Sequence, residues 1–571
     1  MTSDISKEYS FDRYEMFKIK INNNLLYLGS KYNMKKYIDN IQKNLKNTSE
    51  LYDIVVFGSG NGIWLENIDN ITNGKRILIV EPDYNLFKIF LSKNHNVFDN
   101  EVNIICMEED AFYTNLLSAI ETSKIKIFIF SNYDFVYKER FEEFIDKIKD
   151  VIVDISVMEN TNRIYSKTWL ENYMKNLPEI INSNYINKYM NIFKDKPAIV
   201  VSAGPSLDKN IKLLKGNEEK FIIISVGRAL KALKRENIKA DFTAVIDGSE
   251  QMYKVFEDSL ESDIPLLFSE QSGNKIVKNY KGEKIFFSTN DFINSHKVIL
   301  GCNPIKLFQG GSVAHACIDF ARVLGCSTII FIGQDLAYTD NKTHSDTSIA
   351  DFEDNNIKGD TQYWVRGVNE KNVKTSFDLN IFRERIELMI RLYNNITFIN
   401  ATEGGAHIEG TIEENLKDII NKYDKIIDKS ILKQNFKLEI SKKEVIDKLR
   451  KIYNDIDDVI VLCKEAILIN ENLLELYLKS FNKYSNALNR LDEIDKYIQD
   501  KKQVTNVFET LVNVINNDII KTFADEEYCE TITGKIKKIS EKGKFLNYRL
   551  IEAFNYGKPL IKESIDKLEE I

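Results

Sequence analysis

Two blocks of the sequence alternate short apolar runs with longer mixed segments, and this alternation constrains the fold more than any other feature. The first block, from about 51 to 157, contains "LYDIVVFG", "RILIVEP", "VNIICM", "KIKIFIFS" and "DVIVDISV". The second, from about 196 to 400, contains "KPAIVVSAG", "FIIISVG", "DFTAVID", "IPLLFSE", "EKIFFST", "STIIFIGQD" and "NITFINA". Short β-branched runs separated by helix-length stretches indicate a parallel sheet covered by helices. We therefore predict two doubly wound, Rossmann-like α/β domains.

The remaining segments have helical spacing. Residues 158–194 carry aromatic and aliphatic side chains at helical intervals and no strand signal, so we expect a helical connector. Beyond about 430, apolar residues recur every three or four positions among Glu, Lys and Asp, which is typical of an amphipathic helical bundle. A chain of 571 residues is too long to fold around a single hydrophobic core. We predict three domains: 1–195 with the connector, 196–430, and an all-α domain at 431–571.

Composition limits the classes of function. The net charge is −8, and the 78 basic residues are interleaved with 86 acidic ones, which argues against a nucleic-acid binder. The first residues lack a signal peptide and no apolar stretch approaches a membrane span, so we expect a cytoplasmic protein. The cysteines form no CxxC pair, which predicts buried thiols rather than a zinc site or a disulfide framework. They are Cys106, Cys302, Cys317, Cys326, Cys463 and Cys529.

A first glycine-rich turn, "VVFGSGNGIWL", follows the first strand of the first block. Gly58 to Gly62 form the turn, and Glu81 ends the next strand about 20 residues later, where a Rossmann unit places its ribose-binding carboxylate. The spacing departs from G-x-G-x-x-G, and no base or acid follows "EPD". Two readings stay open: a cofactor site, or a degenerate nucleotide fold that serves as a scaffold.

The second block places polar, small or glycine residues after five of its strands. The carboxyl ends of parallel strands open onto one crevice, so these residues predict a ligand site. They are Ser202, Ala203, Gly204, Pro205 and Ser206; Ser225, Gly227 and Arg228; Asp247, Gly248 and Ser249; Ser269 and Glu270; and Gly333, Gln334 and Asp335.

The stretch "FQGGSVAHACIDFARVLG" opens a further helix in this block. Gly310, Gly311 and Ser312 at its start offer N–H groups, a hydroxyl and the positive end of the helix dipole to a phosphate. No Gly-Lys-Ser/Thr follows, so the turn is not a P-loop and favours a single phosphate.

Two loops of this block concentrate titratable groups. "GQDLAYTDNKTHS" gathers Asp335, Tyr338 and His344, the last being one of only five histidines. Such density on a strand-end loop favours function, although a solvated loop histidine is an equal alternative. "GGAHIEG" places His407 after the last strand, where it either closes over a ligand or simply connects to the helical domain.

Four motifs in order, "SAGPSLD", "VIDGSEQ", "QGGSVAHACIDFARVLG" and "GQDLAYTDNKTHS", resemble the central domain of the motility-associated factor (Maf) flagellin glycosyltransferases. The resemblance covers roughly residues 196–430, and the flanking domains match the family by their order. It implies transfer of a nonulosonic acid, such as pseudaminic or legionaminic acid, to serine or threonine of flagellin. Flagellum assembly and motility would depend on that transfer.

The same domain is similar to bacterial sialyltransferases that use CMP-sialic acid. By that resemblance Gly204, Pro205 and Ser206 would line the nucleotide, Gly311 and Ser312 would hold its phosphate or the sugar carboxylate, and Tyr338 would help the phosphate leave. Those enzymes have a catalytic histidine after the last motif, but the comparable stretch "YWVRGVNEKNVKTSFD" has none. His344 is therefore our first choice for the base, and Asp247 or Glu270 the second.

The resemblance and the strand-end pattern together give the candidate site. The catalytic candidates are His344, Asp335, Tyr338, Asp247 and Glu270. The nucleotide-sugar-binding candidates are Ser202, Gly204, Pro205, Ser206, Gly227, Arg228, Gly310, Gly311 and Ser312. The expected donor is a CMP-linked sugar and the expected partner is flagellin, held by the C-terminal helices. We expect no obligatory metal, and a role for Mg²⁺ stays open because several carboxylates end strands.

Two other classes of function stay open. Domains of this kind also resemble archaeal 6-hydroxymethylpterin diphosphokinases, whose chemistry needs ATP, Mg²⁺ and a carboxylate cluster. Alternatively, the chain is a non-catalytic flagellin-binding assembly factor whose sheets have lost their activity.

Overall fold

The computed structural model describes most of the chain and divides into two compact units. The described residues are 4–21, 24–66, 75–94, 102–109, 111–349, 362–368, 371–434, 436–437, 440–524 and 531–570, so Cys529 lies outside them. The N-terminal unit comprises Met1–Tyr165, Leu462–Lys496 and Leu511–Ile551. The central unit comprises Ser166–Val461, Tyr497–Thr510 and Glu552–Ile571.

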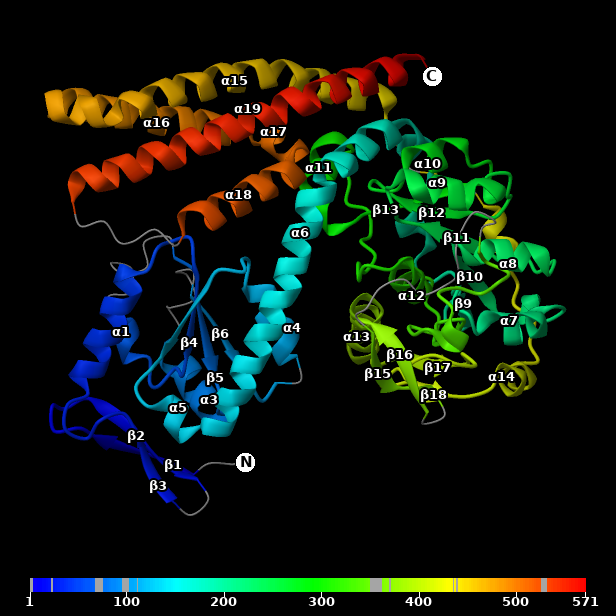
Figure 1. The fold of residues 1–571 in the computed structure, drawn as a ribbon, viewed down its shortest axis with the longest axis horizontal. Helices are drawn as coiled ribbons and strands as arrows, with labels where there is room; N and C mark the ends of the chain where they lie inside the picture. Colours follow the sequence, from blue (N-terminus) through cyan, green and yellow to red (C-terminus); the bar gives the residue numbers. More distant parts are fainter. Residues whose placement is uncertain are drawn as a thin grey trace. The chain divides into compact units, whose positions relative to one another are not determined.

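The N-terminal unit contains a four-stranded parallel sheet in the order β6-β5-β4-β7 (Figure 1). Its strands are β4 (Asp53–Phe57), β5 (Ile77–Glu81), β6 (Val102–Cys106) and β7 (Ile125–Ile129). Its shorter helices are α1 (Lys35–Asn47), α3 (Tyr84–Lys93), α4 (Phe112–Ala119) and α5 (Tyr133–Val136). An antiparallel sheet of β1 (Asp4–Tyr9), β2 (Glu15–Ile21) and β3 (Asn24–Leu28) precedes it, and the sequence analysis did not anticipate this sheet.

The central unit contains a nine-stranded sheet whose pairs are all parallel, in the order β18-β17-β14-β9-β10-β11-β12-β13-β8. The seven predicted runs form β9 (Pro197–Val201), β10 (Ile222–Val226), β11 (Phe242–Val245), β12 (Leu266–Ser269), β13 (Lys284–Phe287), β14 (Thr328–Ile332) and β17 (Thr397–Asn400). The two-residue strands β8 (Asn184–Tyr185) and β18 (Ile412–Glu413) lie at the edges. Strands β9 and β10 are buried throughout, as a sheet covered on both faces requires.

Helices of the central unit connect these strands. They are α7 (Leu207–Asn210), α8 (Ala229–Arg235), α9 (Glu250–Phe256), α10 (Asn274–Asn279), α11 (Ile293–Ile299), α12 (Val313–Val323), α13 (Phe377–Leu392) and α14 (Leu416–Lys422). A hairpin of β15 (Gln362–Arg366) and β16 (Asn372–Ser376) forms a separate two-stranded sheet before α13.

Both parallel sheets reverse their strand order at one position. From β9 the chain proceeds through β10, β11, β12 and β13 on one side, and then returns to place β14 on the other side of β9. In the N-terminal unit β4 has the same place, between β5 and β7. The ends of such paired strands diverge there, so each sheet has a switch-point crevice where ligands bind in this class of fold.

One predicted strand is wrong. The run "DVIVDISV" lies inside α6 (Lys138–Asn182), a helix of 45 residues. Val151 and Ile155, four residues apart, are buried, whereas Val153 and Val157 are 45% and 41% exposed. A strand would have put all four side chains on one face, so burial at helical spacing overrides the β propensity of the run.

The chain after residue 440 is helical, as predicted. Its helices are α15 (Lys442–Lys479), α16 (Phe481–Asp500), α17 (Lys502–Val507), α18 (Glu509–Phe523) and α19 (Ile532–Glu570). Parts of this region belong to each compact unit. The predicted boundaries after 195 and 430 stay predictions, while the fold class, two parallel α/β sheets followed by helices, is confirmed. Within the described residues, no helix combines the length and apolarity of a membrane span.

Candidate functional site

A cavity of about 310 Å³ lies at the switch point of the central sheet. Its walls come from the ends of β9, β10, β11 and β14, the start of α12, and one face of α13. The lining residues include Ser202, Ala203, Gly204, Pro205, Gly227, Arg228, Asp247, Met252, Gly311, Ser312, Gly333, Gln334, Asp335, Leu336, Thr343, His344, Leu379 and Phe382. The structure therefore brings together most of the residues that were predicted from strand ends.

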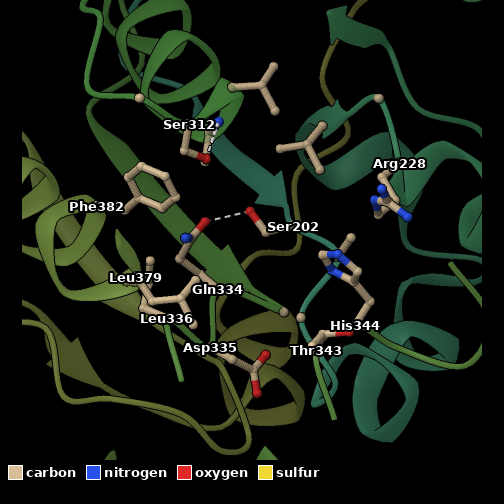
Figure 2. Close-up of a pocket in the computed structure, with 18 of the residues that line it drawn as sticks. Ser202, Arg228, Ser312, Gln334, Asp335, Leu336, Thr343, His344, Leu379 and Phe382 are labelled. Carbon is tan, nitrogen blue, oxygen red and sulfur yellow. Dashed lines mark hydrogen bonds between the residues drawn. The ribbon is translucent and has the colours of Figure 1, made fainter. Parts of the chain in front are cut away.

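The carboxylate of Asp335, which is buried, links the turn after β9 to the loop after β14 by hydrogen bonds. Asp335 accepts hydrogen bonds from the Ser206 hydroxyl at 2.8 Å, from the Ser206 N–H at 3.2 Å, and from the Thr339 hydroxyl. Burial raises the pKa of Asp335, and these hydrogen bonds oppose that shift. Figure 2 shows its carboxylate pointing away from Ser202 and Gln334. Asp335 thus links the two loops through its carboxylate, and it is also one of the residues that line the cavity.

Gly204 and Gly333 allow these two loops to approach. The Gly204 N–H donates to the Gly333 carbonyl at 2.8 Å. A Cβ atom at position 204 would lie 2.1 Å from an oxygen of Asp335, and one at position 333 would lie 2.3 Å from the Ser202 carbonyl oxygen. Both distances are shorter than any real contact, so the turn in "SAGPSLD" requires glycine for close approach. The Ser202 hydroxyl then donates to the Gln334 side chain across the switch point (Figure 2).

The predicted helix start at "GGS" is confirmed, and its N-cap is hydrogen-bonded. Ser312 caps α12: its hydroxyl accepts from the Ala314 N–H at 3.3 Å, and its own N–H donates to His315 Nδ1 at 3.2 Å. His315 is buried, with Nε2 3.0 Å from the Phe382 carbonyl oxygen, and burial lowers its pKa to about 4. The imidazole is therefore neutral at neutral pH, and its Nδ1 can accept the hydrogen bond from the Ser312 N–H. Gly311, at φ +86°, leaves room for the ring of Phe382.

Arg228 and His344 lie on the opposite wall of the cavity. Figure 2 shows both on one side, across from Ser312, Gln334 and Phe382. Arg228 precedes α8. The position of His344 is fixed by its neighbour, because the Ser345 N–H donates to the Ala203 carbonyl at 3.0 Å. A guanidinium and an imidazole thus face a helix N-terminus across a small cavity.

Four predicted site residues do not line the cavity in the described structure: Ser206, Glu270, Gly310 and Tyr338. Ser206 is fully buried in the contact with Asp335. Gly310 lies against the ring of His315, and the Tyr338 N–H donates to the Lys374 carbonyl. Ser206, Gly310 and Tyr338 therefore lie behind the residues that form the walls.

Glu270 lies elsewhere because β12 is three strands away from β9 in the sheet. One of its carboxylate oxygens accepts from the Thr289 N–H at 2.9 Å, and the other lies 3.3 Å from His296 Nε2. The opposite nitrogen of His296 lies 2.9 Å from the Tyr173 hydroxyl. All four side chains are buried. Of the two alternative bases, only Asp247 lines the cavity, and it accepts from the Ser249 N–H at 2.7 Å.

The equivalent crevice of the N-terminal unit is filled by protein. Glu81 is fully buried and accepts from the Ser59 N–H at 2.9 Å and from the Tyr133 hydroxyl at 3.1 Å. Tyr133 also accepts from the Gly60 N–H at 2.9 Å. A Cβ atom at Gly58 would lie 2.4 Å from the Tyr133 ring. The carboxylate and amides that a Rossmann unit offers to a cofactor are thus satisfied internally, which supports the scaffold reading.

Two further predictions concern metals and His407. Among the described residues, no group of three or more His, Cys, Asp or Glu side chains is arranged to hold a metal ion. His407 does not line the cavity; its Nδ1 contacts Glu413 and its Nε2 lies 3.4 Å from Glu409. The "GGAHIEG" loop instead packs under the site, since the Ala406 N–H donates to the Asp335 carbonyl at 2.7 Å.

The fold has a counterpart among known proteins, and part of the chain matches a family model. The structure of a Maf glycosyltransferase from Magnetospirillum magneticum AMB-1 superimposes over 100% of this chain and 94% of its own, with a TM-score of 0.54 and 15% identity. The chain has the fold of a Maf glycosyltransferase. Residues 171–341 match the family described as 6-hydroxymethylpterin diphosphokinase MptE-like. No curated protein matches the sequence significantly. The predicted resemblance to Maf proteins is therefore confirmed at the level of the fold.

The sequence analysis missed the apolar wall of the cavity. Met252, Leu336, Leu379 and Phe382 line it, and the last two come from α13, which follows the motifs that carry the Maf resemblance. The only available signal was the apolar spacing of α13. Leu336 is also unexpected, because it adopts φ +51°, a conformation that strains a residue other than glycine.

Proposed function

We propose that the protein is a glycosyltransferase that moves a nonulosonic acid of the pseudaminic or legionaminic type from a CMP-linked donor to a serine or threonine hydroxyl of flagellin, in the cytoplasm. The observation that carries the proposal is the cavity at the switch point, where Arg228 and His344 face the N-terminus of α12. The Maf fold supports it over the whole chain. In this proposal the C-terminal helices hold the body of flagellin, and flagellum assembly and motility depend on the reaction.

The polar and apolar walls suit the two halves of such a donor. The N-terminus of α12, beside Gly311 and Ser312, offers the positive end of the helix dipole to one phosphate, and Arg228 supplies a positive charge for it or for the sugar carboxylate. Phe382, Leu379 and Met252 offer apolar surface to the cytosine ring. A cavity of about 310 Å³ is at the small end of ligand sites, which fits the nucleotide with the sugar at the mouth.

The residues would act on a transition state in which positive charge develops at the anomeric carbon. The acceptor oxygen bonds to that carbon, the bond from the carbon to the phosphate oxygen breaks, and both electrons of that bond leave with CMP. His344 accepts the hydroxyl proton, with Asp247 as the second choice. The positive end of the α12 dipole and Arg228 stabilise the charge on the departing phosphate, so the step needs no metal. Asp335 positions the "GPSL" turn through Ser206 and Thr339.

The test is donor-dependent modification of flagellin. Purified protein is incubated with flagellin and with CMP-pseudaminic acid, CMP-legionaminic acid or ATP separately, each with Mg²⁺ or with EDTA, and intact masses are measured. A mass gain of one sugar residue, with CMP release and no effect of EDTA, is expected from one CMP-sugar. Flagellin that binds but gains no mass from either donor would favour the non-catalytic assembly factor.

A second function is favoured by the match of residues 171–341 to the MptE-like family. The matched range spans the cavity walls from β9 to β14. In that case the donor is ATP, and a diphosphate is transferred to a hydroxymethyl pterin with release of AMP. Magnesium-dependent AMP formation with 6-hydroxymethyl-7,8-dihydropterin, without reaction of either CMP-sugar, would replace the proposal by this one.

A further inference from the structure

The β15–β16 hairpin has two chemically different faces. Its register pairs Val365 with Val373, and both side chains pack on the core of the central unit. The opposite face carries the pairs Trp364 with Lys374 and Arg366 with Asn372. The apolar inner face holds the hairpin on the core. The side chains of the outer face are therefore not needed for this packing and can serve binding.

The outer face combines an exposed aromatic ring with positive charge. Trp364 is 62% exposed, and the Lys374 ammonium lies 5.6 Å from the centroid of its ring. Arg366 is also exposed, as is Lys371, the residue that precedes β16. The described residues of the hairpin, 362–368 and 371–376, contain three cations and no acidic side chain, within a chain whose net charge is −8. We call Trp364, Arg366, Lys371 and Lys374 the cationic face.

The hairpin that carries this face packs beside residues that line the cavity. The Thr375 hydroxyl donates to the carbonyl of Leu336 at 2.8 Å, and Leu336 lines the cavity. The Tyr338 N–H donates to the Lys374 carbonyl at 2.8 Å. Helix α13 begins directly after β16, and its Leu379 and Phe382 line the cavity. Figure 1 shows the hairpin beside α13. Leu379 is the third residue after the end of β16, a span of at most about 11 Å.

We propose that the cationic face docks an acidic, extended segment of the acceptor polypeptide and so presents a nearby serine or threonine to the cavity. The inference rests on the proposed function and names the chemistry of its acceptor. Arg366, Lys371 and Lys374 pair with aspartate and glutamate side chains, and Trp364 covers the backbone between them. Aromatic and arginine side chains are the residues most often found at the centre of protein interfaces.

The first experiment measures binding and needs no donor. A fluorescent peptide of Glu and Thr residues is titrated with the full chain, and fluorescence anisotropy reports the Kd at low and high salt. We expect binding that weakens with salt, and a peptide with Gln in place of Glu is expected to bind at least about tenfold more weakly. Trp364→Ala and the double variant Arg366→Glu/Lys374→Glu are each expected to raise the Kd by about tenfold or more.

Matched controls change the same residue types on other elements. Phe481→Ala removes an aromatic side chain that is 70% exposed, and Lys425→Glu reverses an exposed charge; both are expected to bind the Glu peptide as the wild type does. Thermal melting verifies that each variant is folded. Equal binding by the hairpin variants, equal binding of the Gln peptide, or competition by a neutral oligosaccharide in place of the acidic peptide overturns the proposal.

A second experiment separates this proposal from the proposed function. With an active donor, Trp364→Ala is expected to raise the KM for the protein acceptor about tenfold, while kcat and the slow hydrolysis of the donor stay at the wild-type level. A fall in donor hydrolysis would assign Trp364 to the donor site instead and contradict the inference. If no donor reacts at all, the proposed function fails, and the anisotropy result still decides the docking.

Discussion

Each parallel sheet has a glycine turn after the strand at which its strand order reverses, β4 or β9. Among the described residues, the turn after β9 borders a cavity, whereas the turn after β4 is covered by Tyr133. At the central switch point the turn at Gly204 is linked to the loop after β14 by the carboxylate of Asp335. At the N-terminal switch point Tyr133 fills the space above Gly58, and its hydroxyl bonds to Glu81. Both arrangements satisfy buried polar groups, so the fold itself does not distinguish a site from a scaffold.

The two switch points differ in which groups form hydrogen bonds with their buried polar atoms. Around Gly204 the polar atoms of the turn pair with side chains behind the cavity, which leaves the helix start, Arg228 and His344 to face it. Around Gly58 the carboxylate that would bind a ribose pairs with the amide and hydroxyl of Ser59. A nucleotide fold can therefore become a scaffold through an aromatic side chain placed in its crevice, with its glycines retained.

The largest effect is expected at the open crevice. His344→Ala removes the proposed base and should lower kcat for transfer by about 10²- to 10⁴-fold, because a positioned base contributes about that much. The Kd for the CMP-sugar, measured by calorimetry, should change by less than about threefold, since the proton is transferred only in the reaction. His407→Ala is the matched control, because that imidazole pairs with Glu409 and Glu413 outside the cavity. Loss of donor binding in His344→Ala would place the imidazole in recognition instead.

The next effect is expected at the filled crevice and concerns stability. Tyr133→Ala removes a fully buried ring and two hydrogen bonds, so the N-terminal unit should lose about 3–5 kcal/mol of unfolding free energy. Hydrogen exchange of the β4 and β5 amides measures this loss in the full chain. Transfer by the folded protein should stay within about twofold of the wild type. If added nucleotides restored the lost protection, the unit would be a ligand site that Tyr133 closes, and the comparison would fail.

A third effect is the pH dependence of the same unit. Burial raises the pKa of Glu81 from 4.5 to about 7. Below pH 4.5 the carboxyl is protonated in both states, and its contribution to stability is fully present. As the pH rises from about 4.5 to 7, the unfolded chain releases this proton first, so stability should fall by about 3 kcal/mol and then level off. In Glu81→Gln, the stability of the unit, measured by hydrogen exchange of β5, should no longer fall over this pH range. An unchanged fall would mean that other carboxyl groups cause the pH dependence.

Many residues that line the central cavity could be grouped from the sequence because their signals are local. Strand ends and helix starts, such as Pro205, Arg228 and Ser312, carry their own signals, and parallel topology brings them to one edge. The filled crevice could not be predicted, because Tyr133 lies 73 residues from Gly60 and its hydroxyl competes with a ligand only in three dimensions. Glu270 failed to reach the cavity for the related reason that strand order, which local pattern does not encode, put β12 far from β9.

The smallest effect tests whether the start of α12 binds the donor phosphate or only begins a helix. Ser312→Ala removes the cap of α12 and should lower stability by about 1 kcal/mol, because the hydroxyl bonds to the Ala314 N–H. Ser312→Asp keeps a capping oxygen, so stability should stay near that of the wild type, but its carboxylate repels a bound phosphate. If the phosphate lies here, Ser312→Asp should weaken CMP binding by about tenfold, more than Ser312→Ala does. The opposite order of the two variants, with CMP affinity following stability, would mean that the helix start is structural, as the turn at Gly58 is.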